Sequence, residues 1–120
     1  MYKKLDVWKK SIELIKDVYS VLEDLPKSEE YNLKSQMRRS VVSVALNIAE
    51  GKSRQSAKDC AHFLNVAIAS LNETEACLSI CEELGFIAAN NVIHEKCKVL
   101  GYRINALKSK IYPKGKTNEE

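Results

Sequence analysis

The strongest constraint on the fold is a spacing of apolar residues that repeats along nearly the whole chain. In four segments, residues 5–25, 32–50, 56–85 and 90–112, apolar side chains recur at alternating intervals of three and four. This spacing places them on one face of an α-helix. Pro26, Gly51, Gly85 and Pro113 stand at the ends of these segments, and both residue types commonly end helices. The sequence therefore predicts four amphipathic helices.

Four helices joined by loops of about six residues predict an all-α fold, namely an antiparallel up-down four-helix bundle. The bundle would occupy residues 1–112 as one domain, with residues 113–120 as a polar C-terminal tail. Asn32 and Ser56 are expected N-caps, and Gly51 is an expected C-cap.

Composition and charge favour a soluble protein without a membrane segment. The 120 residues are 45% hydrophobic and 29% charged, and the formal net charge is +3. The longest mostly apolar run, residues 41–49, is too short to cross a membrane. The first residues lead directly into charged sequence without the apolar core of a signal peptide. We therefore expect a cytoplasmic protein that does not bind membranes.

Motifs for catalysis are incomplete in this chain. Gly51-Lys52-Ser53 ends like a phosphate-binding loop, but Leu46 stands where that motif needs its first glycine. The chain has only two histidines and no pair of Glu-x-x-His motifs, which a di-iron bundle requires. We therefore expect no enzymatic activity, no cofactor and no small-molecule substrate.

The cysteines admit two interpretations. Folding the last two predicted helices against each other brings Cys77, Cys81, His94 and Cys97 to about the same level. Three thiols and an imidazole could hold zinc. However, Cys81 and Cys97 already occupy core positions of the apolar repeat, and a free cysteine packs well as a small buried residue. Inert core thiols are the favoured interpretation, so no metal is expected.

Two charged residues fall inside apolar helix faces. Arg38 lies between the directions of Ala45 and Ala49, and Glu75 lies between those of Leu64 and Ile68. Because an unpaired buried charge is very costly, Arg38 and Glu75 could form a buried ion pair, within one subunit or between two. The alternative is that both side chains extend to solvent.

The predicted helix 32–50 is apolar over more than half of its circumference. One bundle core cannot cover so broad a sector, so we expect a homo-oligomer. Val42, Leu46 and Ala49 are the expected interface residues.

Several segments together resemble the 23S rRNA-intervening sequence proteins, which are small bacterial four-helix bundles. The resemblance covers about residues 3–112, and the segments that carry it are Leu5-Asp6-Val7-Trp8, Gln36-Met37-Arg38-Arg39-Ser40, Asn47-Ile48-Ala49-Glu50-Gly51-Lys52-Ser53-Arg54, Ser70-Leu71-Asn72-Glu73-Thr74-Glu75 and Leu84-Gly85-Phe86-Ile87. It implies assembly as a ring-like homopentamer and no catalytic activity. It also implies kinship with accessory proteins of retroelements that contact reverse transcriptase and nucleic acid.

A basic stripe suggests contact with RNA or DNA. Lys96, Arg103 and Lys110 are seven residues apart on one helix face, and Lys52 and Arg54 would join them if they share one rim. Such contacts would be electrostatic and weakly sequence-specific. The alternatives are a merely solvated helix face, or a scaffold ring that docks a partner such as a reverse transcriptase without touching nucleic acid.

Overall fold

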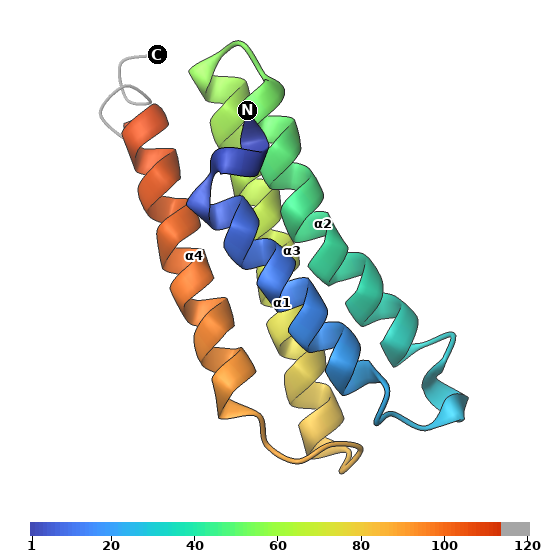
Figure 1. Ribbon diagram of the computed structural model, residues 1–120. Coiled ribbons are helices and arrows are strands. Elements are labelled where there is room, and N and C mark those ends of the chain that lie inside the picture. Colours follow the sequence, from blue (N-terminus) through green and yellow to red (C-terminus); the bar gives the residue numbers. More distant parts are fainter. Residues whose placement is uncertain (114–120) are drawn as a thin grey trace.

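The computed structural model describes residues 1–113, and over that range it confirms an all-α fold without strands (Figure 1). Most of the predicted tail 113–120 lies outside the described residues. The four long helices lie close to the predicted segments, and two single-turn 3-10 helices precede α1 and α2. Their bounds are η1 Tyr2–Lys4, α1 Asp6–Leu22, η2 Lys27–Glu29, α2 Leu33–Ser53, α3 Ala57–Glu83 and α4 Asn91–Ile111.

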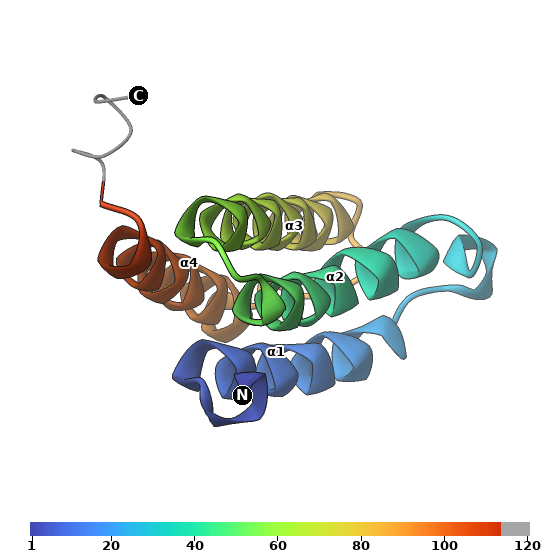
Figure 2. The ribbon, with the colours of Figure 1, turned by 90° about the horizontal axis from the view of Figure 1, so that it is seen from above.

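The helices form a four-helix bundle measuring 49 × 25 × 22 Å. Viewed from its end, α1, α2, α3 and α4 follow one another around a central core (Figure 2), and each is in contact with the next, with α4 returning to α1. Ion pairs Asp6–Arg103 and Asp17–Lys96 show that α1 and α4 run in opposite directions. None of the helices in residues 1–113 combines the length and apolar character of a membrane span.

The core is built by the apolar repeat that the sequence shows. Every helix contributes fully buried apolar side chains at spacings of three, four or seven residues. The largest of these are Leu14 and Val18 from α1, Met37, Val41, Val44 and Ile48 from α2, Leu64, Leu71 and Leu78 from α3, and Leu100 and Ile104 from α4.

Small and polar residues line the contact between α2 and α3, and the apolar pattern alone did not indicate this. A Cβ at Gly51 would lie 3.2 Å from the carbonyl oxygen of Cys60. Ser40 and Thr74 share a hydrogen bond of 2.8 Å in the interior. These residues bring the two helix backbones close together.

The helix ends match the predicted caps in part. The Ser56 hydroxyl accepts a hydrogen bond of 3.0 Å from the Asp59 amide, as expected for an N-cap. Asn32 precedes α2 without a side-chain cap bond. The expected C-cap role of Gly51 is wrong, because α2 continues through it to Ser53.

Candidate functional site

Ion pairs with α1 occupy two of the three residues of the predicted basic stripe. The Lys96 ammonium lies 2.6 Å from a carboxylate oxygen of Asp17. The Arg103 guanidinium lies 2.7 Å from a carboxylate oxygen of Asp6. The hydrogen bond that Lys96 donates to Asp17 raises the pKa of Lys96, so this ammonium stays charged but is locally neutralised. The stripe is therefore not a free row of cations.

Lys110 lies instead at the end of the bundle that contains the loop between α2 and α3. Lys52 and Ile111 line the same small cavity there, together with Leu5 from the N-terminal segment. Within residues 1–113, neither Lys52 nor Lys110 is paired with a carboxylate. Arg54 is held more firmly, since its guanidinium lies 2.8 Å from Glu50 and 4.5 Å above the centre of the Phe63 ring.

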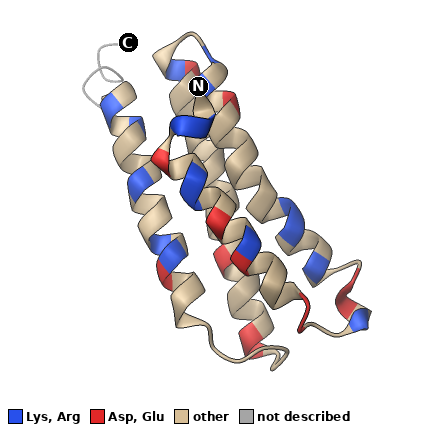
Figure 3. Ribbon diagram, viewed as in Figure 1, with Lys and Arg blue, Asp and Glu red and all other residues tan. Residues whose placement is uncertain are grey.

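Further lysines reach this end from other parts of the chain. We call the group the basic end, and Figure 3 shows the charges on the ribbon. It consists of Lys3 and Lys4 in η1, Lys52 and Arg54 around the end of α2, and Lys108 and Lys110 in the last turn of α4. The sequence interpretation missed Lys3, Lys4 and Lys108. The up-down order of the helices was the available signal, because it brings the chain start and the end of α4 to one end.

The three expected interface residues lie in different environments. Val42 packs partly against the core, Ala49 is half-buried, and Leu46 is 63% exposed. Because α1 and α2 run in opposite directions, with Leu5 near Lys52, Trp8 lies about level with Ala49. Val42, Leu46 and Ala49 are four and three residues apart, so they form an apolar strip on one face of α2 at the level of Trp8, and Leu46 is its most exposed member.

The predicted pairing of Arg38 with Glu75 is wrong within the chain. Arg38 donates to a carboxylate oxygen of Glu30 at 2.7 Å and to the Glu30 carbonyl at 3.3 Å. The hydrogen bond from Arg38 is the main reason that the pKa of Glu30 is lowered. Both partners are partly exposed. The partner of Arg38 lies in the loop before α2. The sequence prediction considered only pairs between residues of two helices, so it did not include Glu30. A pair between subunits stays a prediction.

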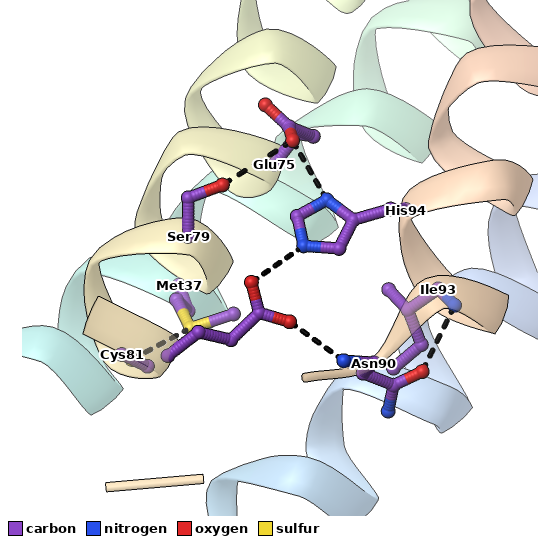
Figure 4. Close-up of polar contacts among 8 residues, drawn as sticks. Met37, Glu75, Ser79, Cys81, Asn90, Ile93 and His94 are labelled. Carbon is purple, nitrogen blue, oxygen red and sulfur yellow. Dashed lines mark hydrogen bonds and ion pairs between the residues drawn. The ribbon is translucent and has the colours of Figure 1, made fainter. Parts of the chain in front are cut away.

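Glu75 belongs to a cluster that joins α3 to α4 (Figure 4). The Nδ1 atom of His94 lies 2.7 Å from a carboxylate oxygen of Glu75. Its Nε2 atom lies 2.7 Å from a carboxylate oxygen of Glu82. The second oxygen of Glu82 accepts a hydrogen bond of 2.6 Å from the backbone amide of Asn90. Ser79 donates to Glu75 at 3.3 Å.

The geometry does not support the zinc alternative. His94 directs both ring nitrogens at carboxylates, and residues 1–113 contain no group of three His, Cys, Asp or Glu side chains placed to hold a metal ion. Cys77, Cys81 and Cys97 are buried free thiols. Burial, aided by the charge of Glu75, raises the pKa of Cys97 to about 12, which disfavours the thiolate that zinc needs.

A sequence model of the family described as "23S rRNA-intervening sequence protein" matches residues 3–106. The chain belongs to that family. A comparison with curated proteins found no match.

Solved structures support the same fold for this 23S rRNA-intervening sequence family member. It is similar to a crystal structure from Bacteroides thetaiotaomicron described as a protein with unknown function from the S23 ribosomal protein family. The TM-score is 0.79 at 23% identity, and the match covers 91% of this chain and 99% of the other. At that identity the likeness concerns the fold alone. Neither comparison indicates a catalytic family.

Proposed function

We propose that this protein is a non-enzymatic assembly module that forms a ring-like homopentamer of antiparallel up-down bundles and contacts RNA or DNA through its basic end. The observation that carries the proposal is the gathering of lysines from η1, α2 and α4 at one end of the bundle. If the ring axis follows the helices, each subunit presents this end on the same rim. Repetition around the rim multiplies the phosphate contacts and therefore the affinity.

The protruding Leu46 supports self-association. It lies on an apolar strip with half-buried Trp8, Val42 and Ala49, and a strip of this kind is a common subunit contact. In a head-to-tail arrangement, two different patches meet at every interface, and a suitable rotation closes the chain of subunits into a ring.

Light scattering tests the assembly. Leu46→Asp should release monomers of 13.6 kDa with unchanged helix content. Leu84→Asp is a matched control, because Leu84 is also an exposed leucine, at 58%, but lies at the C-cap of α3. A wild-type protein that scatters as a monomer at micromolar concentration would refute the ring.

Binding measured over a range of salt concentrations tests the basic end. Each lost phosphate contact reduces the slope of log K against log salt by about 0.9 on duplex DNA or about 0.7 on single strands. We expect Lys52→Gln with Lys110→Gln to flatten the slope and weaken binding to all sequences alike. Lys96→Gln with Arg103→Gln removes the same number of cations, but these are held by Asp17 and Asp6. Equal effects of the two double variants would contradict the assignment.

A second candidate function is docking of a partner protein without nucleic acid. It is favoured by exposed apolar residues on α4, where Val92 is 66% and Tyr102 is 65% exposed. Val92 also lines, together with Val99, an open groove of about 470 Å³ between α1 and α4. An intact ring that binds no nucleic acid at low salt would favour this scaffold function.

A further inference from the structure

His94 lies between two carboxylates that project from one face of α3, about two helical turns apart. Glu75 and Glu82 are seven residues apart, and each places a carboxylate oxygen 2.7 Å from one ring nitrogen (Figure 4). A neutral imidazole carries one N–H and one lone pair, whereas the imidazolium donates from both nitrogens. With both carboxylates ionised, the two short contacts require the doubly protonated ring.

We propose that His94 is a proton-operated clamp that holds the first turns of α4 against α3 when its ring is charged and releases them when the ring is neutral. The inference does not depend on ring assembly or on nucleic-acid binding.

The clamp holds the beginning of α4 at two points. Glu82 contacts the His94 ring through one carboxylate oxygen and accepts the Asn90 amide at 2.6 Å through the other. Asn90 in turn accepts a hydrogen bond of 3.0 Å from the Ile93 amide and so caps α4. Loss of the charged ring leaves Glu82 facing a lone pair or removes the donor to Glu75. Either change loosens the α4 start.

Two surface hollows meet at this part of α4. His94 lines an open polar pocket of about 560 Å³ between α3 and α4. Asn91 and Glu95 line both that pocket and the apolar groove between α1 and α4. A movement of the first turns of α4 therefore changes the shape of both surfaces, including the one that exposes Val92.

Few other charged groups face His94, and they come from α4 and α1. On α4 itself, Glu95 and Lys98 line the same polar pocket with opposite signs, and the Cys97 thiol is kept neutral by its raised pKa. From α1, Asp17 faces α4 but is bound by Lys96. Glu75 and Glu82 are thus the groups that decide the protonation of His94.

The direction of the pH dependence follows from opposing effects on the ring. Burial lowers the pKa of His94, but the hydrogen bonds and charges of Glu82 and Glu75 together raise it above 6.5. The pKa of Glu82 is lowered below 4.5, because burial is outweighed by its bonds to Asn90 and His94. The clamp therefore stabilises the folded protein fully between pH 4.5 and pH 6.5, which are the ordinary pKa values of the glutamate and histidine side chains. It is lost as pH rises through the native pKa of His94, or falls through that of Glu82.

NMR titration of the wild-type protein, which follows both ring nitrogens of His94, tests the clamp. We expect the His94 ring to titrate above pH 6.5 and to carry protons on both nitrogens below its midpoint. Glu75→Gln should lower that midpoint. A His94 midpoint at or below the ordinary histidine value of 6.5 would overturn the proposal.

Hydrogen exchange at one fixed pH below the His94 midpoint supplies the second measurement. His94→Gln should accelerate exchange of the amides in the first two turns of α4 by about tenfold or more, since bonds to charged groups are stronger than neutral ones. His62→Gln is the matched control and should leave those amides unchanged. Equal protection of α4 in both variants would also overturn the clamp.

Discussion

The buried hydrogen bond between Ser40 and Thr74 allows the contact between α2 and α3 to be tested quantitatively. The two residues are 4% and 0% exposed, and their hydroxyl oxygens lie 2.8 Å apart. Thr74 donates to the carbonyl of Ser70 at 2.9 Å and Ser40 to that of Met37 at 3.2 Å. Because the bond to Met37 is the longer of the two, we assign Ser40 as the donor in the shared bond. Thr74→Val preserves the shape but removes the acceptor. Leaving a buried hydroxyl without its partner costs about 1–3 kcal/mol.

The carbonyl of Met37 reduces this penalty, because the Ser40 hydroxyl can turn to it at 3.2 Å. We therefore expect Thr74→Val to lower the free energy of unfolding by about 1–2 kcal/mol, and Ser40→Ala by about 1 kcal/mol. In the double variant neither hydroxyl is left unpaired. It should be destabilised by less than the sum of the single variants, with a coupling of about 0.5–1.5 kcal/mol.

Urea unfolding followed by circular dichroism measures all four members of this cycle. The pair Ser43 and Ser70 is the control, because its hydroxyl bond of 2.9 Å bridges the same helices nearer to solvent. Its alanine cycle should show a smaller coupling. Strict additivity in the buried cycle would refute the assigned hydrogen bond and the close packing inferred from it.

Two further predictions concern glycines and thiols. Gly101→Ala should raise the melting temperature, because its Cβ would meet only Leu71 at 3.5 Å and alanine favours helix by up to about 1 kcal/mol. Gly51→Ala should gain less or lose stability, since its Cβ would lie 3.2 Å from the Cys60 carbonyl. Cys97, with its pKa of about 12, should resist a thiol reagent at pH 8 until urea unfolds the bundle. Rapid labelling of Cys97 in the folded protein would contradict its burial.

The helices were predictable because their signal is local. Residues such as Leu14 and Val18 recur with the helical period, and burying that face is the main source of stability. The exact end of a helix is less determined by local sequence. Gly51 shows this, because it serves close packing against α3 rather than ending α2.

Charge partners were harder to predict because they depend on tertiary register. The spacing of Lys96 and Arg103 on one face was correct, but that face turns toward α1 and meets Asp17 and Asp6. The two aspartates are eleven residues apart, which is also a one-face spacing on a helix. The spacing of the charges in the sequence was therefore consistent with these pairs. The sequence did not show that these faces of α1 and α4 meet, or which residues lie at the same level.

Aromatic residues on the apolar helix faces lie nearer to the surface than the aliphatic ones. Trp8 and Phe63 are half-buried and Tyr19 is exposed, and all the largest fully buried side chains are aliphatic apart from Met37 and Thr74. Helical periodicity indicates the face of a residue but not how completely its neighbours cover a large ring.

The basic end and the His94 clamp are far enough apart to act independently. Along α3, Glu75 lies 19 residues beyond the N-cap Ser56, which is roughly 28 Å at the helical rise of about 1.5 Å per residue. Charges separated by more than the Debye length, about 8 Å at physiological salt, are largely screened from each other. His94→Gln should therefore leave the salt dependence of nucleic-acid binding unchanged while it loosens α4. If the same variant flattened that dependence, the phosphate contacts would extend along α4 toward the clamp, and the basic end would not be the whole binding surface.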